Sequence, residues 1–285
     1  NLETNEKYEI IIVDSDSTDN TLDIAKSFSC NIISIPKNNW SWGFSLNEGI
    51  RHSSGIYLII ISAHCYITNK NFLNTIENLF NKFPVCCIYG QQIPIKGYDC
   101  FEEIELLDNF PDHKEYLINK DSNIIGVSNA CAVVKKEIWN KIPFNEIVES
   151  LEDAYWAREV LKKENQILYT SLISVFHSHP FNPNYIYRKW YWRTYELLCF
   201  NKYKPSFMII ELFKRIYKAI WWRTFELYKF KKRLNHLQHL RIITIYIFLK
   251  IKNHSIMQAK KDFIDNKKSS YWDLSISSKI SFLQQ

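Results

Sequence analysis

The stretch that decides the fold is YEIIIVDSDSTDNT, residues 8–21, in which a run of β-branched residues leads into carboxylates and hydroxyls. Residues 10–13 predict a short parallel strand that is buried on both faces, because a continuous apolar run followed by turn residues is typical of such strands. Ligands of open α/β sheets bind beyond the carboxyl ends of their strands. Asp14, Ser15 and Asp16 follow the strand directly and are therefore candidate binding residues.

Residues 17–19 come before a predicted helix at 21–29, and two roles are open for their side chains. Ser, Thr and Asp commonly cap the first turn of a helix. The same groups suit hydrogen bonds to a ribose or a base. A cap does not require a carboxylate on the strand itself, so Asp14 is the stronger candidate for binding a ligand.

The chain has 285 residues and is 46% hydrophobic, which is enough for one catalytic domain and an appendage. Up to about residue 179, short apolar runs alternate with helical segments, as expected for an α/β domain built around a mostly parallel sheet. The predicted strands are 8–13, 31–35, 56–61, 85–89, 130–135 and 168–176. The predicted helices are 21–29, 45–52, 71–83, 136–141 and 151–163. Residues 91–122 predict a loop-and-helix excursion over the site.

From about residue 185 the sequence changes to long helical patterns rich in aromatic and basic residues. We therefore predict an α/β domain at 1–184 and a helical, basic C-terminal region at 185–285. Residues 1–185 carry 15 Lys and Arg against 24 Asp and Glu, whereas residues 186–285 carry 21 against 6. Such a region suits an anionic membrane surface, although a solvated helical surface has the same composition.

Two further patterns bear on the setting of the chain. Residues 242–249 are strongly apolar but much shorter than the roughly 20 residues that span a bilayer, so an interfacial helix is the membrane alternative. Residues 191–197 and 221–227 are similar to each other, either as two amphipathic turns or by coincidence. The seven cysteines show no Cys-x-x-Cys spacing, which argues against a disulfide framework and favours a reducing compartment.

The motif at 14–21 resembles the Asp-x-x-Ser-Thr-Asp-x-Thr signature of family 2 glycosyltransferases. Four further segments resemble the family's signatures in the family's order: the helix and strand at 42–61, the strand and helix at 128–139, the acidic pair Glu152-Asp153, and His177-Ser178-His179. The resemblance implies the Rossmann-like GT-A fold and an enzyme of the bacterial polysaccharide or rhamnosyltransferase type. The family's fold normally opens with a strand before this motif, so we expect that strand, and part of the nucleotide site, to be missing here.

One departure from the family affects the mechanism. The strand at 56–61 ends in the family with an Asp-x-Asp motif that carries a metal and a diphosphate, but this chain has Ser62-Ala63-His64 there. The resemblance still implies a nucleotide-sugar site, which we place at Asp14, Ser15, Asp16, Asn47, Ser62 and His64. A polar position on an exposed helix face is the alternative for Asn47.

The resemblance also implies a catalytic base in the acidic pair. We predict Asp153 as the base that takes the acceptor proton, with Glu152 in reserve, because a positioned carboxylate suits that task. Trp156 and Trp42 are the candidate walls for a sugar or an acceptor, although core packing is the more common fate of Trp. Residues 150–153 also resemble a helix capping box, and that role is compatible with catalysis.

The leaving diphosphate needs a positive partner, and two kinds are open. Mn or Mg is the cofactor that the family implies, and His64, His177 and His179 are the candidate ligands. Histidine nitrogen suits Mn or Zn better than Mg. Alternatively, His64 donates directly to a phosphate oxygen, while Arg188, Lys189 or Arg193 supplies the charge in place of a metal.

The resemblance therefore implies an inverting glycosyltransferase. It uses a nucleoside-diphosphate sugar and a glycan or lipid-linked acceptor, in the cytoplasm or peripherally on the inner face of the cell membrane, in bacterial surface polysaccharide synthesis. This reading expects no nucleic-acid partner. Two alternatives are a metal hydrolase built on the histidines and a non-catalytic protein of the same fold, whose basic region binds an acidic partner.

Overall fold

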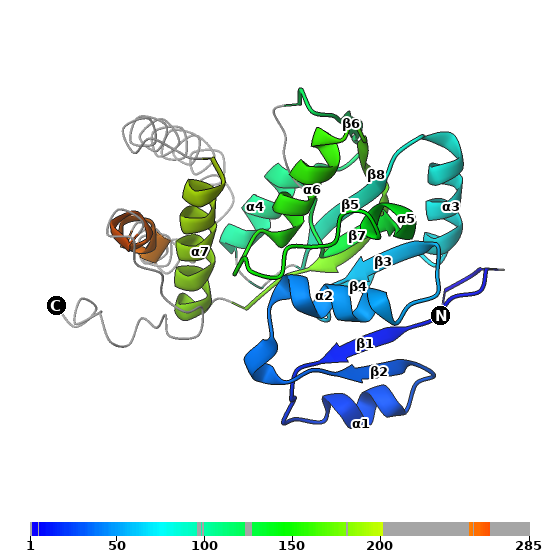
Figure 1. Cartoon of the computed structure of the whole chain (residues 1–285), viewed down its shortest axis with the longest axis horizontal. Coiled ribbons are helices and arrows are strands. Elements are labelled where there is room, and N and C mark those ends of the chain that lie inside the picture. The colour runs from blue at the N-terminus through cyan, green and yellow to red at the C-terminus, as the bar shows by residue number, and fades with distance from the viewer. Residues whose placement is uncertain are drawn as a thin grey trace, which may run out of the picture. The chain divides into compact units, whose positions relative to one another are not determined.

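The computed structural model describes residues 2–4, 6–95, 98, 100–122, 127–180, 182–201, 251–252 and 254–262 (Figure 1). The chain divides into two compact units, residues 1–181 and 182–285. The first unit contains the strands and most of the described helices, and the second contains the helix α7 (Pro183–Asn201) and the helical residues near 251–262.

Strands and helices alternate through most of the first unit, as the sequence predicts. The strands are β1 (Ile11–Asp14), β2 (Asn31–Ser34), β3 (Tyr57–Ile61), β4 (Tyr66–Ile67), β5 (Cys87–Pro94), β6 (Glu115–Ile118), β7 (Cys131–Lys135) and β8 (Ile167–His177). The helices are α1 (Thr21–Lys26), the short 3-10 helix η1 (Lys37–Asn39), α2 (Trp42–Arg51), α3 (Phe72–Lys82), α4 (Cys100–Asn109), α5 (Lys136–Trp139) and α6 (Glu152–Lys162). The predicted strands and helices are confirmed, η1 and β4 are additional to them, and α4 and β6 lie within the predicted loop-and-helix excursion 91–122.

The sheet is mixed, so the prediction of a mostly parallel sheet is wrong. β5 pairs with β8 in parallel, but β3 and β5 both pair antiparallel with β7, and β4 and β6 both pair antiparallel with β8. β6 and β7 both run opposite to β5 and β8, so the chain reverses direction between β5 and β6, in the segment that contains α4. The order is β3-β7-β5-β8-β4, with β6 beside β8.

The strands β1 and β2 form a separate parallel pair. Among the described residues, β1 has no strand on its second edge, and β3 pairs with β7 alone. Ile10, just before β1, is 46% exposed, and the three apolar residues of β1 are only partly buried. The prediction that this strand is buried on both faces is therefore wrong, because β1 lies in a separate pair of strands and not in the six-stranded sheet, whose two faces carry the apolar clusters.

Helices pack on both faces of the six-stranded sheet (Figure 1). The amphipathic helix α3 buries Phe72, Ile76 and Leu79 against one face. On the other face, α2, α5 and α6 share a second apolar cluster with the alternate residues of the same strands. Successive side chains of a strand point to opposite faces, so Ile88 of β5 joins the first cluster and Tyr89 the second.

The second unit has an aromatic interior where it is described. Tyr191 and Trp192 of α7 are fully buried, and the Tyr191 hydroxyl donates a 2.6 Å hydrogen bond to Oδ2 of Asp262. The segment 191–197 lies in α7, whereas its echo at 221–227 and the apolar run at 242–249 lie outside the described residues. None of the helices in the described ranges combines the length and hydropathy of a membrane-spanning segment.

Candidate functional site

One edge of the six-stranded sheet collects most of the predicted site residues. β3, β5 and β8 all end at this edge and β7 begins there, because the register pairs Ile61 with Cys131 and Pro94 with His177. The segments that follow β3 and β8 therefore meet the segment that precedes β7. Sequence reasoning grouped these segments only through the family resemblance, since their order in the sheet is not readable from the chain.

Three histidines come together at this edge. β4 turns back along β8 and pairs Tyr66 with Phe176, which places the turn that contains His64 beside the end of β8. Nε2 of His64 lies 2.8 Å from Nε2 of His177, and one ring nitrogen from each of His64, His177 and His179 lies within 4.8 Å of the others. Segments more than a hundred residues apart in the chain thus form one cluster of nitrogen donors.

A carboxylate that the sequence analysis missed supports this cluster. Glu102 of α4 is only 6% exposed, and its two oxygens accept hydrogen bonds from the backbone N–H and the Nδ1 of His179, at 2.5 and 2.6 Å. Glu102 lies in the predicted excursion 91–122, and no local pattern there marks a glutamate that faces a histidine 77 residues away. The only available signal was its place in the first turn of an amphipathic helix.

The surroundings of the cluster favour neutral donors. Partial desolvation lowers the pKa of His64, and the neighbouring His179 adds to that shift. Burial raises the pKa of the adjacent Cys65 to about 11, which leaves it a protonated thiol. Three imidazoles form a donor set that suits a divalent transition-metal ion. The residues present therefore fit a metal, although not the carboxylate set that the family's usual motif supplies.

The acidic pair begins α6, and its two members have different surroundings. Glu152 is 7% exposed and accepts a 3.0 Å hydrogen bond from Nδ2 of Asn129, which precedes β7 at the same sheet edge. Burial raises the pKa of Glu152 to about 8, and the neighbouring Asp153 adds to the shift. Asp153 is partly exposed, and its Oδ1 accepts a hydrogen bond from the N–H of Ala154.

The helix start at this pair differs from the predicted capping box. The N-cap position is Leu151, and no side chain caps it. Leu151 has φ 63°, a left-handed conformation that is uncommon for a residue other than glycine. Strained backbone of this kind persists only where the surrounding structure holds it, and it is often found at functional sites. The chain before α6 therefore turns sharply to present the acidic pair.

The prediction that Trp156 forms a sugar wall is wrong. Its side chain is 1% exposed, its Nε1 donates a 2.7 Å hydrogen bond to the carbonyl of Ile142, and its ring packs 5.5 Å from that of Phe144. Trp156 lies one helical turn after Glu152, on the face of α6 that packs on the core. Trp42 keeps its candidacy, because it is 43% exposed and contacts Trp40 edge to face at 4.9 Å.

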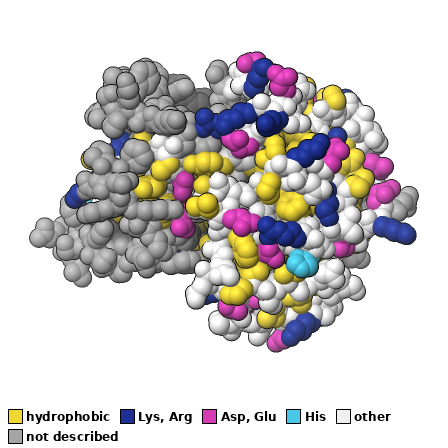
Figure 2. All heavy atoms as spheres, in the orientation of Figure 1, with side chains coloured by type: hydrophobic (Ala, Val, Ile, Leu, Met, Phe, Trp, Pro, Cys, Tyr) yellow, Lys and Arg dark blue, Asp and Glu magenta, His cyan; other side chains and the backbone are white. Residues whose placement is uncertain are grey.

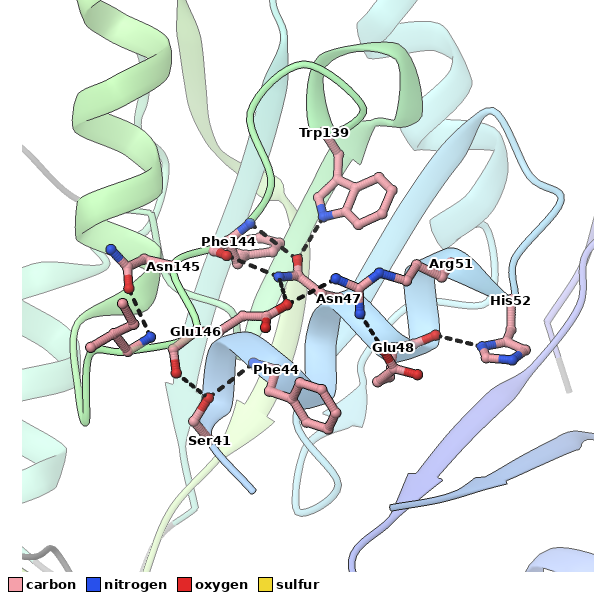
Figure 3. A network of polar contacts seen from close by, with 11 residues as sticks. Ser41, Phe44, Asn47, Glu48, Arg51, His52, Trp139, Phe144, Asn145 and Glu146 are labelled. Carbon is pink, nitrogen blue, oxygen red and sulfur yellow. Dashed lines mark hydrogen bonds and ion pairs between the residues drawn. The ribbon is translucent and has the colours of Figure 1, made fainter. Parts of the chain in front are cut away.

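Asn47 is buried rather than on an exposed helix face. It is 1% exposed, and its Nδ2 donates to the carbonyl of Phe144 and to Oε1 of Glu146, at 2.9 and 2.7 Å. Its Oδ1 accepts from Trp139 Nε1 and from the N–H of Phe144 (Figure 3). All four hydrogen-bonding positions of this amide are used by the protein, so a direct bond to a nucleotide would have to replace one of them.

The same helix holds the loop that leads to the acidic pair. Ser41 donates through Oγ to the carbonyl of Glu146, and Arg51 pairs with the Glu146 carboxylate at 2.9 Å (Figure 3). A Cβ on Gly43 would lie 2.0 Å from the carbonyl oxygen of Asn145, so only glycine allows this approach. We call residues 142–150 the strap. The strap is fastened to α2 on one side and to α6, through Trp156, on the other.

The acidic residues at the end of β1 are engaged in local turns. Asp14 is 4% exposed, and its Oδ2 accepts a 3.2 Å hydrogen bond from the N–H of Ser17. Asp16 has φ 57° and accepts from the N–H of Lys37, the first residue of η1. Ser15 lies between these two carboxylates. Ser62 closes the turn before the histidines, since its carbonyl accepts from the N–H of Cys65 at 2.8 Å.

The basic residues that the sequence offers in place of a metal all lie on α7, in the second unit. Arg193 and Lys252 both contact the ring of Trp190, and Lys189 lies over Tyr185. On the face that Figure 2 presents, basic and acidic side chains are interspersed with apolar ones. Most of the basic residues of 185–285 lie outside the described residues, so the predicted membrane-binding surface stays a prediction.

Comparisons with known proteins agree with this fold. Residues 1–142 match the family model described as Glycosyl transferase family 2. The O-antigen chain rhamnosyltransferase WbaN of Salmonella anatum is 27% identical over 198 residues, which cover 66% of this chain and 62% of WbaN. The dolichyl N-acetyl-alpha-D-glucosaminyl phosphate 3-beta-D-2,3-diacetamido-2,3-dideoxy-beta-D-glucuronosyltransferase of Methanococcus voltae is 36% identical over 77 residues, which are 25% of this chain and 24% of that protein. The chain thus spans less than two thirds of the length of either relative.

Two solved structures share the fold at low sequence identity. The mannosyltransferase PcManGT from Pyrobaculum calidifontis, solved with GDP-Man and Mn2+, superposes with a TM-score of 0.54 at 12% identity, over 91% of this chain and 79% of that one. TarS 1-349 of S. aureus, solved with UDP, gives 0.50 at 14% identity, over 92% and 83%. Both support an α/β GT-A-like fold with a mixed sheet between helices. The family match over residues 1–142 and the similarity to WbaN show that the chain belongs to glycosyl transferase family 2.

Proposed function

We propose that the protein is an inverting glycosyltransferase that moves a sugar from a nucleoside-diphosphate sugar to a hydroxyl of a glycan or lipid-linked acceptor. We further propose that it acts in bacterial surface polysaccharide synthesis. The family match over residues 1–142, which includes the acidic strand end at Asp14 and Asp16, is the observation that carries this proposal. The likeness to an O-antigen chain rhamnosyltransferase supports the choice of polysaccharide, and structural relatives with UDP and GDP-Man support the donor class.

In the proposed reaction, Asp153 is the base. The acceptor oxygen attacks the anomeric carbon as its proton passes to the Asp153 carboxylate, and the bond from that carbon to the diphosphate oxygen breaks on the opposite face. The electron pair of that bond leaves with the nucleoside diphosphate. Glu152 supports this role as a buried neutral carboxyl, because a protonated neighbour adds no negative charge beside the base.

The two ends of the donor have separate sites in this proposal. Asp14, Ser15 and Asp16 bind the nucleoside, whereas Ser62 and the histidines face the diphosphate. A divalent ion held by His64, His177 and His179 would neutralise the charge that develops on the diphosphate. Asn47 acts indirectly, by fastening the strap that leads to the acidic pair. Trp42 is the proposed apolar wall for the sugar or the acceptor.

The location proposed for the reaction is the inner face of the cell membrane. A catalytic domain at 1–184 and a basic region at 185–285 suit this place, because the basic region carries 21 Lys and Arg against 6 Asp and Glu from residue 186 onward. Each lysine or arginine near an anionic membrane surface contributes about 1 kcal/mol to the free energy of binding to that surface. A lipid-linked acceptor would then lie close to the bound enzyme.

The direct test is a transfer assay on the whole chain. Labelled UDP-, GDP- and dTDP-sugars are offered with lipid-linked and free glycan acceptors, with Mn2+, Mg2+, Zn2+ or a chelator. The expected result is a glycoside from one donor class, whose anomeric proton shows by NMR the configuration opposite to that of the donor. Retained configuration would overturn inversion. Donor hydrolysis that no acceptor diverts would instead favour a hydrolase, and no donor binding at all would favour a non-catalytic protein.

A further inference from the structure

The contact between Glu102 and His179 is the most specific polar contact near the histidine cluster. One carboxylate, 6% exposed, holds both the backbone N–H and the ring Nδ1 of a single residue. Taking a carboxylate out of water is costly unless hydrogen bonds compensate for the lost hydration. Two short bonds to one histidine fix both the position of its backbone and the rotation of its ring.

This geometry also selects the tautomer of His179. An ionised carboxylate only accepts hydrogen bonds, so the Nδ1 that lies 2.6 Å from Glu102 carries the proton. Nε2 is then the nitrogen that keeps a lone pair. Histidines that bind metals commonly donate their other ring N–H to a carboxylate in this way, which orients the ring and increases its basicity. The Glu102–His179 contact has the form of such a supporting interaction.

The donor set indicates which cations the site takes. Three imidazoles offer nitrogen, whereas Mg2+ prefers oxygen ligands and keeps several of its waters. The three imidazoles contribute no negative charge, and the buried Glu102 carboxylate supplies one through its contact with His179. A borderline transition-metal ion matches three nitrogens and one remaining position for an oxygen ligand.

We propose that Glu102 is a positioning residue, which holds His179 for coordination, and that the resulting site binds Zn2+, Co2+ or Mn2+ in preference to Mg2+. This inference rests on the metal site of the proposed function and adds to it a supporting residue and a metal preference. According to this proposal, the helix α4, which lies within the excursion 91–122, contributes a residue that supports the metal site.

The test is calorimetric titration of the metal-free whole chain with each metal chloride alone, for the wild type, Glu102→Gln and Glu103→Gln. Glu103→Gln is the matched control, because it makes the same change on the next residue of the same helix. We expect one ion per chain for Zn2+, Co2+ and Mn2+, with Mg2+ binding much more weakly. Glu102→Gln should weaken transition-metal binding by about 10- to 100-fold, as loss of such supporting partners does, and Glu103→Gln should not.

If Glu102→Gln folds poorly, two spectroscopic measurements test the role of Glu102 without that variant. The visible spectrum of Co2+ bound to the wild type should show nitrogen coordination and should change in Glu102→Asp. Nitrogen NMR of histidine-labelled, metal-free protein should show His179 protonated at Nδ1, and a His52→Gln sample removes the signal of His52, whose Nδ1 also donates, to the carbonyl of Glu48. An Nε2-protonated His179 would overturn the role of Glu102.

The outcomes separate this inference from the proposed function. Unchanged metal affinity in Glu102→Gln would overturn the positioning role and leave the metal site standing. Mg2+ binding as tight as that of Mn2+ would overturn the metal preference. If the wild type binds none of the four ions, both the inference and the metal site fail, while glycosyl transfer in the presence of a chelator would show that the proposed reaction proceeds without them.

Discussion

At the scale of single residues, the two members of the acidic pair at the start of α6 have different surroundings and therefore different charges. Glu152 is buried against Asn129 and has a raised pKa, so it is a neutral hydrogen-bonding group near pH 7. Asp153 lies next to it, partly exposed, in the first turn of the helix. A negative charge is favoured there, because the N-terminal end of a helix carries a partial positive charge. The two environments therefore favour opposite charge states.

Asp153→Asn should lower kcat by about 10²- to 10⁴-fold, the range for a positioned general base. The amide oxygen of Asn can still accept the N–H of Ala154, so the fold and the donor affinity should stay near those of the wild type. The measurement is kcat and KM for the donor, with Asp121→Asn as an exposed control of the same chemistry. A variant with near-normal kcat would remove Asp153 from the role of base.

The stability of the protein should fall as the pH rises through the range in which Glu152 holds its proton. The pKa of Glu152 lies at about 8 in the folded protein, against an ordinary value of 4.5. Between these values the folded state binds more protons than the unfolded state, so the free energy of unfolding decreases with pH, by up to about 1.4 kcal/mol per pH unit. Urea unfolding at pH 5, 6, 7 and 8 measures this slope.

Glu152→Gln should flatten that slope, because a neutral amide does not titrate. Its side-chain oxygen can still accept the hydrogen bond from Asn129. Glu159→Gln is the control, since Glu159 lies on the same helix but is exposed. Equal slopes for the wild type and Glu152→Gln would show that some other group sets the pH dependence.

At the scale of elements, the strap connects the helix α2 to the acidic pair. Ser41 at the N-cap of α2 and Asn47 and Arg51 of α2 all bond to it (Figure 3). Gly43 of α2 lies against its backbone. The strap then continues to the left-handed Leu151. A displacement of α2 would therefore move the strap, and with it the acidic pair that follows the strap in the chain.

Gly43→Ala tests this coupling. The new methyl group would overlap the carbonyl of Asn145, so the strap has to move, at a cost of about 1 to 3 kcal/mol in stability. We expect kcat to fall by more than the lost folded fraction explains, with little change in KM for the donor. Gly55→Ala is the matched control, because a Cβ there meets only one backbone atom, at 3.3 Å. A loss of kcat equal to the loss of folded protein would mean that the strap only stabilises the fold.

The elements also show how far sequence reasoning reached. Periodicity predicted six strands and five helices, since long apolar runs and helical repeats are local signals. It missed β4, which has only two residues, yet β4 places His64 beside His177. It assigned Trp156 to a sugar because one-dimensional spacing does not show which face of α6 packs on the core. The role of Glu102 was not predicted for a similar reason, because its partner, His179, lies 77 residues away in the chain.

At the scale of the whole molecule, the described strands form two sheets rather than one. β3 lies at one end of the larger sheet, and Ile59 on this strand is 36% exposed. An unpaired strand edge with apolar side chains is a template for pairing with another chain. We therefore expect the isolated chain to self-associate as its concentration rises.

Ile59→Lys should reduce that association, because charged side chains on an edge strand oppose pairing. Sedimentation velocity over a concentration series measures the effect. Ile24→Lys is the control, since Ile24 is 59% exposed but lies on the helix α1 and not on a strand. Equal effects of the two substitutions would assign the association to general surface hydrophobicity instead of the strand edge.

The division into two sheets has a consequence for how a donor binds. Asp14 belongs to the small sheet and the histidines to the large one, and among the described residues no backbone ladder joins the two sheets. A nucleotide sugar that contacts both sheets would hold them in a fixed relative position. The entropy lost in this ordering would reduce the observed binding free energy. Bound donor should then slow amide hydrogen exchange in β1 and β2, far from the diphosphate itself. In such an enzyme, the bound substrate is one of the contacts that keep the two sheets in place relative to each other.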